Sequence, residues 1–367
     1  MKLHCCFSTL FFLLITRVFC QTDPVIHSLY LIGDTGKDTI ASEAMQLLYF
    51  ECFDDTAGTV LFLGDNVYPD GNNPNQSRKN TYKAERILIS QLEALNGYKG
   101  NCYMIPGNHD WSCGKPSGLK AVKAQKELVN SWSKTNSDFR NKGSVYFEQP
   151  GLPGPHSVVI HPKLRLVMLD SQWWMQADLL HPTGKLSGKS RKGTKEKALH
   201  ELDSLLTICE RSGEIAIIAA HHPLYSNGKH SHRKEPLRFL FNYTPLHIFS
   251  LLGLNRMFRE DLPQPRYRRY VKSVLKITEQ HSNVIYVSGH EHTMQYIIKG
   301  KLHHIVSGSG SHTRTLDRYK HPAIFMDDQQ PGFFSLTLHE SGEIFLHAYG
   351  IRDRGEYWRT FVMHLPK

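Results

Sequence analysis

Five short apolar runs in this chain each end in a cluster of polar residues. Each run is rich in Val, Ile, Leu or Tyr and lacks the regular polar interruptions of a half-exposed strand. Continuous runs of this kind are typical of strands that are buried on both faces of a sheet. The runs with their polar ends are HSLYLIGDTG (27–36), GTVLFLGDNVY (58–68), NCYMIPGNHD (101–110), EIAIIAAHHP (214–223) and NVIYVSGHEH (283–292). The pattern predicts five buried strands, each followed by a sharp polar turn.

Stretches with helical periodicity separate these runs. Apolar residues recur there at intervals of three and four, which predicts amphipathic helices. The stretches are 38–54, 79–96, 118–134, 194–211 and 265–281. This alternation, with further strands after Gly332, predicts a layered α/β fold in which the polar turns meet in one crevice. Because no internal repeat or long linker divides the chain, we expect residues 21–367 to form one catalytic domain.

The first twenty residues differ from the rest of the chain. Lys2 precedes an apolar stretch over residues 7–19, and a cleavage point can be placed before Gln21. This pattern predicts a cleaved secretory signal over residues 1–20, and therefore a secreted or periplasmic protein. A membrane anchor is the alternative. A span needs about 20 apolar residues, however, and Arg17 interrupts this run.

The chain is basic. Its formal net charge is +10, and removal of Lys2 and Arg17 with the signal would reduce it to +8. Much of the excess positive charge lies in residues 185–197 and 266–272. We predict that residues 185–197 form an exposed loop. Such charge either attracts anionic substrates and surfaces or simply keeps a face solvated. The basic stretches lack regularly interleaved aromatic residues, so nucleic acid is not an expected partner.

Four cysteines remain once the signal is removed: Cys52, Cys102, Cys113 and Cys209. Four thiols allow three pairings, and their spacing does not choose among them. Cys102 and Cys113 bracket the third polar turn, so a disulfide between them would brace that turn. The alternative is that the cysteines are buried thiols.

The polar turns carry side chains of the kinds that bind metal ions. The first two turns supply carboxylates and a phenol, the third a carboxamide, and the last two imidazoles. The candidate ligands are Asp34, Asp65, Tyr68, Asn108, His221, His290 and His292. Oxygen donors favour hard cations, whereas imidazole suits iron, zinc or manganese. Two ions about 3.5–4 Å apart can hold the entering and leaving oxygens of a phosphoryl transfer, so the turns indicate a binuclear site.

The order of the motifs GDTG, GDNVY, GNHD, HHP and GHEH resembles that of the binuclear metallophosphoesterases, the calcineurin-like family. Tyr68, in GDNVY, is similar to the tyrosine that marks purple acid phosphatases, in particular the tartrate-resistant type. The resemblance covers residues 25–312. It implies a four-layer αββα sandwich of two mixed β-sheets, with two unlike metal ions at one edge.

The resemblance also implies a role for each ligand. Asp34, Tyr68 and His292 would hold a ferric ion. Asp65 would bridge this ion to a divalent one, which would be Fe, Zn or Mn. The remaining ligands of the divalent ion would be Asn108, His221 and His290.

Three further histidines flank this ligand set. By the same resemblance, His109 would contact a phosphate oxygen of the substrate. His230 lies nine residues after His221, which matches the spacing of an outer-sphere histidine that would donate a proton to the leaving group. His222 is either a packing residue or a substrate contact.

Residues 233–270 depart from the pattern of the small phosphatases. This segment contains an apolar stretch at 236–258 and looks like an insertion. It is either a loop folded onto the core, a lid or wall over the site, or a contact with a lipid surface or a partner. The insertion bears on the size of the substrate and not on the metal chemistry.

These patterns together predict an acid phosphatase that hydrolyses phosphate monoesters by direct attack of a metal-bound hydroxide. The expected substrates are phosphorylated small molecules or phosphoproteins. One alternative is a phosphodiesterase or nucleotide pyrophosphatase of the same superfamily. Another is a non-catalytic module that binds phosphorylated ligands. Tyr68 and His230 favour the monoesterase over the diesterase.

Overall fold

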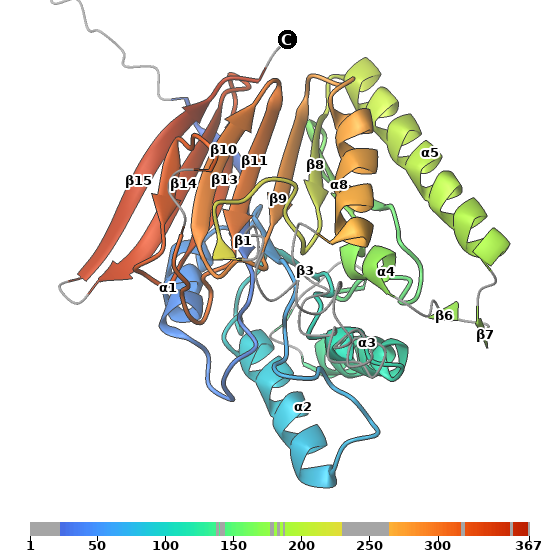
Figure 1. The fold of residues 1–367 in the computed structure, drawn as a ribbon. Coiled ribbons are helices and arrows are strands. Elements are labelled where there is room, and N and C mark those ends of the chain that lie inside the picture. Colours follow the sequence, from blue (N-terminus) through green and yellow to red (C-terminus); the bar gives the residue numbers. More distant parts are fainter. Residues whose placement is uncertain are drawn as a thin grey trace, which may run out of the picture.

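Two β-sheets pack against each other in this chain, whose structure is a computed structural model (Figure 1). It describes residues 23–136, 139, 144–176, 180–181, 184–185, 188–229, 264–316, 320–352 and 355–365. The predicted signal (1–20), His230 and residues 233–263 of the predicted insertion lie outside the described residues.

The first sheet has six strands in the order β15-β14-β13-β1-β2-β3. The bounds are β1 Val25–Ile32, β2 Thr59–Phe62, β3 Asn101–Met104, β13 Gly332–His339, β14 Ile344–Arg352 and β15 Gly355–Met363. The first three are parallel, and the last three extend the sheet antiparallel from β1. Ile32 pairs with Phe62, and Phe62 with Met104. The three parallel strands therefore end at the same level.

The second sheet has seven strands in the order β12-β10-β11-β9-β8-β5-β4. The bounds are β4 His156–His161, β5 Leu164–Met168, β8 Ile215–Ala219, β9 Val284–Ser288, β10 Met294–Lys299, β11 Leu302–Ser307 and β12 Phe325–Asp327. Its centre, from β5 through β8 and β9 to β11, is parallel. The remaining strand pairs are antiparallel. A separate short pair, β6 (Leu180–His181) and β7 (Gly184–Lys185), lies outside both sheets.

Helices flank the two sheets, as Figure 1 shows for α5 and α8 beside β8 and β9. The bounds are α1 Glu43–Cys52, α2 Arg78–Glu93, α3 Gly118–Thr135, α4 Ser171–Met175, α5 Gly188–Ser212 and α8 Pro265–Thr278, with a 3-10 turn at Ser112–Gly114. α1 packs against β13 and β14, α2 against α3, and α8 against both α4 and α5. Two mixed sheets with flanking helices confirm the predicted α/β sandwich.

The core lies where the two sheets face each other. β13 of the first sheet packs against β10 and β11 of the second. Phe334 on β13 is fully buried and contacts Phe325 on β12, with 5.8 Å between ring centroids. Burying one such side chain contributes about 1.5–3 kcal/mol. Every residue of β2 and β9 is buried, so strands covered on both faces explain the continuous apolar runs there.

The prediction of an exposed loop at 185–197 is wrong for its larger part, because α5 begins at Gly188. Ala198 and Leu202 are buried on this helix. The ammonium group of Lys195, one turn earlier, lies 5.1 Å from the ring centroid of Trp174. Long basic side chains can pack their stems on aromatic surface while the charge stays near water. Packing therefore extends the helix into a stretch whose composition indicated a loop.

The proposed brace between Cys102 and Cys113 is not formed. Cys52, Cys102 and Cys209 are buried, Cys113 is partly exposed, and all four are thiols in the structure. The alternative of unbridged thiols therefore describes them, and hydrogen bonds hold the third turn. Within the described part of the chain, we find no helix with the length and apolar character of a membrane span.

Candidate metal centre

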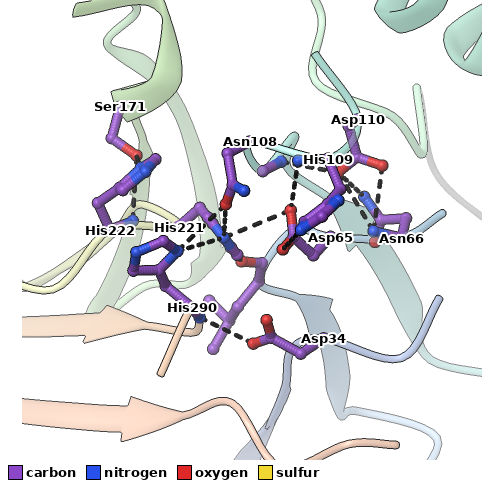
Figure 2. A network of polar contacts seen from close by, with 12 residues as sticks. Asp34, Asp65, Asn66, Asn108, His109, Asp110, Ser171, His221, His222 and His290 are labelled. Atoms are coloured by element: carbon purple, nitrogen blue, oxygen red, sulfur yellow. Dashed lines mark hydrogen bonds and ion pairs between the residues drawn. The ribbon is translucent and has the colours of Figure 1, made fainter. Parts of the chain in front are cut away.

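The polar turns meet at one edge of the paired sheets because the strands before them run in the same direction. β1, β2 and β3 are parallel neighbours in one sheet, and β8 and β9 are parallel neighbours in the other. The carboxyl ends of such strands form a common crevice in open α/β sheets. Figure 2 shows the side chains of Asp34, Asp65, Asn108, His221 and His290 gathered at this place.

Four of the predicted ligands have a left-handed backbone conformation. The φ angles are 60° at Asp34, 54° at Asp65, 75° at His290 and 53° at His292. A non-glycine residue in this region costs on the order of 1–3 kcal/mol and persists only where its surroundings hold it there. Such residues cluster at active sites and ligand clamps. The turns are therefore built to aim these side chains at the expense of local stability.

Asp34, Tyr68 and His292 form a group that we call the Tyr68 half-site. The Tyr68 hydroxyl donates to Asp34 Oδ1 at 2.9 Å and lies 3.3 Å from His292 Nε2. His292 Nε2 lies 3.5 Å from Asp34 Oδ1. Donor atoms that share one ion at about 2.0–2.2 Å lie about 3 Å apart. The three donor atoms are therefore spaced as ligands of one ion would be.

Asn108, His221 and His290 form a second group, the Asn108 half-site. Asn108 Oδ1 lies 2.9 Å from His221 Nε2 and 3.1 Å from His290 Nδ1. The two imidazole nitrogens are 3.3 Å apart. His221 Nδ1 donates to the Leu63 carbonyl at 2.8 Å. This bond leaves Nε2 of a neutral ring with its lone pair facing the group, as a metal ligand requires.

Asp65 lies within reach of both half-sites, and Figure 2 shows the contact of its carboxylate with His221. Its Oδ1 is 3.4 Å from His221 Nε2, on the Asn108 side. On the other side, ligand atoms of Asp34, Asp65 and His292 all lie within 4.8 Å of one another. The backbone N–H of His109 donates to Asp65 Oδ1 at 2.9 Å. One carboxylate is thus within reach of both groups, which is the arrangement that a bridging ligand needs.

The donor set fits two cations. Burial raises the pKa of Asp34 to about 7, where His221 lowers it in part and Asp65 adds to the rise. Burial also disfavours the charge on Asp65, but His221 and His109 outweigh it and lower the pKa. Two adjacent buried carboxyl groups of this kind are stabilised by bound cations. Carboxylate, phenol and carboxamide oxygens with imidazole nitrogens match iron, zinc or manganese.

Metal binding at this site should release protons at neutral pH. Burial lowers the pKa of His221, but Asp65 and Asp34 outweigh burial and raise it to about 10. A metal ion needs the neutral imidazole, so binding displaces about one proton from His221, and affinity should fall as pH decreases. Calorimetry of Zn²⁺ binding in buffers of different ionisation enthalpy measures this release. Enthalpies that do not depend on the buffer would contradict the expectation.

His109 lies beside the half-sites and is not among their donor atoms. Its ring is 4.3 Å from that of Tyr68, and its side chain is 24% exposed. Nδ1 donates to the Pro69 carbonyl at 2.6 Å. Nε2 lies 4.0 Å from Asp65 Oδ2 and faces the site. The substrate contact that the resemblance implies for His109 stays a prediction, and so does the role of His230, which lies outside the described residues.

His222 is fully buried behind the site. Its Nδ1 lies 2.8 Å from Ser171 Oγ, and its ring contacts those of Tyr267 and His290 at 5.2 and 4.5 Å. Of the two roles left open by the sequence, these contacts favour packing. His222 packs behind His290 and so supports the Asn108 half-site.

His312 is a site residue that the sequence motifs do not reveal. Its ring lies 4.0 Å from that of His292 and 5.9 Å from that of Tyr68, and it is partly exposed. Ser311 beside it donates to the Asp34 carbonyl at 2.5 Å. The Gly- and Ser-rich segment at 308–312, which follows β11, therefore lies beside the Tyr68 half-site. No local chemical motif marks His312, and only the Gly- and Ser-rich composition of the segment before it could have drawn attention to this place.

A comparison with known protein families matches residues 27–294 to the calcineurin-like phosphoesterases. This chain belongs to that family. The matched range includes all seven predicted ligands, from Asp34 to His292. The resemblance to the binuclear metallophosphoesterases is thus confirmed at the level of the family.

Individual relatives are distant. Glideosome-associated protein 50 of Plasmodium falciparum (isolate 3D7) is 22% identical over 391 residues, covering 99% of this chain and 82% of that protein. The solved structure of GAP50, the anchor in the inner membrane complex of Plasmodium, has a TM-score of 0.55 at 18% identity, covering 93% of this chain and 89% of that one. A dimetal phosphatase from Danio rerio has a TM-score of 0.50 at 15% identity, with coverage of 92% and 100%. These likenesses show the fold.

Proposed function

We propose that the chain is an acid phosphatase of the purple acid phosphatase type, which hydrolyses phosphate monoesters at a binuclear metal site. The observation that carries the proposal is the position of Asp65. It lies within reach of both the Tyr68 half-site and the Asn108 half-site. Two adjacent cations, when bound, lower the pKa of a water ligand and neutralise charge on the phosphoryl oxygens.

The Tyr68 phenol favours a ferric ion over a divalent one in the Tyr68 half-site. Burial raises the pKa of its hydroxyl well above the ordinary value, and Asp34 and Asp65 add to this effect. The phenol therefore loses its proton most readily to a strongly acidic ion such as Fe³⁺. A divalent ion, Fe, Zn or Mn, would suit the neutral donors Asn108, His221 and His290 of the other half-site.

The remaining work of the protein is to position the substrate and to supply a proton. Phosphoryl transfer depends mainly on positioning and on neutralising the equatorial oxygens. His109, held by the Pro69 carbonyl with Nε2 facing the site, would bind a phosphate oxygen. His230 would give a proton to the leaving alkoxide, because histidine is suited to this in mildly acid conditions.

Iron-loaded protein should be coloured and should hydrolyse an aryl phosphate. Tyrosinate bound to ferric iron absorbs visible light, so Tyr68→Phe should abolish the band. The variant removes one oxygen and the bond to Asp34, which is 2.9 Å long. Absorption spectra and iron analysis of both proteins measure this. As a matched control, Tyr82→Phe changes an exposed tyrosine on α2 and should keep the band.

A protein without bound metal and without phosphatase activity would overturn the proposed function. Hydrolysis of a diester at the rate of the monoester would instead favour a phosphodiesterase or nucleotide pyrophosphatase. The likeness to glideosome-associated protein 50 supports the other alternative, a non-catalytic module, because GAP50 is an anchor in the inner membrane complex. On that alternative the chain would bind phosphorylated ligands tightly without turning them over.

The place of action and the partners are part of the same proposal. The apolar stretch at residues 7–19 and the cleavage point before Gln21 support export, so the protein would act in a secreted or periplasmic setting. Its substrates would be phosphorylated small molecules or phosphoproteins. The part of the predicted insertion that precedes α8, residues 233–263, would supply a further contact with a surface or a partner, because Tyr267 and Tyr270 on α8 are buried.

A further inference from the structure

A buried glutamine on α2 connects the two turns that carry Asp34 and Asp65. Gln91 is 1% exposed. Its Oε1 accepts a hydrogen bond from Thr35 Oγ1 at 2.6 Å. Its Nε2 donates to the Asn66 carbonyl at 2.8 Å and to the Ile87 carbonyl of its own helix at 3.0 Å. The side-chain amide therefore ties two loops to one rigid helix.

The two groups that Gln91 holds are placed alike. Thr35 directly follows Asp34, and Asn66 directly follows Asp65. Both aspartates have left-handed φ angles, 60° and 54°. Such conformations relax unless the neighbouring backbone is fixed. Gln91 holds the residue after each strained carboxylate.

The connection continues from the second turn to the third. The Asp110 carboxylate accepts hydrogen bonds from the backbone N–H of Asn66 at 3.1 Å and from the backbone N–H of Gly107 at 2.7 Å. Asn66 Nδ2 also donates to Asp110 Oδ2 at 3.1 Å. Gln91 thus stands at one end of a buried series of bonds that spans the first three ligand-bearing turns (Figure 2 shows the Asn66–Asp110 part).

We propose that Gln91 is a positioning residue for the metal centre, which sets the place of Asp34 relative to Asp65 and so the affinity of the Tyr68 half-site. Its side-chain hydrogen bonds go to Thr35, Asn66 and Ile87 and not to a predicted metal ligand, so it acts through Thr35 and Asn66. This inference rests on the metal site of the proposed function. It goes further by assigning control of that site to a helix outside all five sequence motifs.

The test compares two buried glutamines. Gln91→Met keeps the length of the side chain and removes both bonds to the turns. Gln125→Met on α3 is the matched control, because Gln125 is fully buried and also bonds through both amide atoms, to the Asp110 carbonyl and the Tyr146 hydroxyl at 3.2 Å each. It bonds to the backbone carbonyl of Asp110 and not to the carboxylate that holds Asn66 and Gly107, and it has no hydrogen bond to Thr35 or Asn66. Both variants should lose stability to a similar extent in chemical denaturation.

Only Gln91→Met should change metal binding. Calorimetric titration of the metal-free protein with Zn²⁺ should show a loss of about 10–100-fold in the affinity of one site, the range for residues that orient metal ligands. The kcat of this variant at low Zn²⁺ should recover when excess Zn²⁺ is added, with KM unchanged. Equal Zn²⁺ affinities in wild type, Gln91→Met and Gln125→Met would overturn the inference.

Thr35→Val tests the same hydrogen bond from the Thr35 side. This variant keeps the proposal testable if Gln91→Met does not fold. It removes the hydroxyl that donates to Gln91 Oε1 and should weaken the same Zn²⁺ site. In the double variant, Thr35→Val should weaken Zn²⁺ binding little beyond the effect of Gln91→Met, because both changes remove the same hydrogen bond between Thr35 and Gln91. Zn²⁺ binding without phosphatase activity would defeat the proposed function alone. A wild type that binds no Zn²⁺ would overturn both proposals.

Discussion

Asp65→Asn should reduce phosphatase activity by on the order of 10³-fold or more, because it weakens both metal ions together. The carboxylate lies within reach of both half-sites. A carboxamide has no charge and cannot bridge two cations as a carboxylate does. The kcat/KM on an aryl phosphate and the zinc or iron content per protein measure the loss. Full metal content with normal activity would contradict the assignment of Asp65 as the bridge.

Asp70→Asn is the matched control for this change. Asp70 lies five residues further along the same loop, is about a third exposed, and pairs with Lys115 at 2.6 Å. A surface pair of this kind contributes about 0–1 kcal/mol. The control should therefore keep its metal ions and its activity. A comparable loss in both variants would show that the loop as a whole, and not the bridge, is sensitive to lost charge.

Gly107→Ala should disrupt the site without removing any ligand. A Cβ atom at this position would lie 2.3 Å from Asp65 Oδ1 and 2.4 Å from the Asp65 backbone nitrogen. The backbone cannot yield as a flexible side chain would, so Asp65 must move. Overpacking of this kind costs about 1–3 kcal/mol of folding free energy. We expect weaker Zn²⁺ binding and a large loss of activity, measured by calorimetry and by aryl phosphate hydrolysis.

Gly193→Ala provides the control for the added methyl group. Gly193 lies in α5, and a Cβ there would meet no atom within 4 Å. Alanine in a helix interior is more stable than glycine by about 0.5–1 kcal/mol. This variant should be as active as wild type and slightly more stable. Full Zn²⁺ affinity in Gly107→Ala would show that Asp65 tolerates displacement.

Much of the fold follows from local patterns. The apolar runs at 27–36 and 283–292 became β1 and β9, since continuous Val, Leu and Tyr residues suit strands covered on both faces. Stretch 185–197 shows the limit of composition. Its Gly, Ser and Lys residues indicated a loop, but packing of Lys195 on Trp174 and burial of the following turn extended α5 through most of it.

The candidate site was less predictable than its motifs suggest. Asp34 and Tyr68 could be nominated from their positions after predicted strands. Gln91 and His312 could not, because neither lies in one of the five motifs: Gln91 bonds to Thr35 and Asn66 beside the ligands, and His312 lies beside His292. Thr35 and Gln91 are 56 positions apart, so no local sequence pattern could predict the hydrogen bond between them.

The sequence by itself determined which donor atoms the protein has and that they follow buried strands, because strand and turn preferences are local. The tertiary structure decided which donors share a half-site. His290 Nδ1, for example, lies 3.1 Å from Asn108 Oδ1 across 182 positions. Contacts of this length exist only after parallel strands align their ends and two sheets pack together. The physical reason is that the order of strands in each sheet is fixed by packing of the whole chain, not by any segment of it.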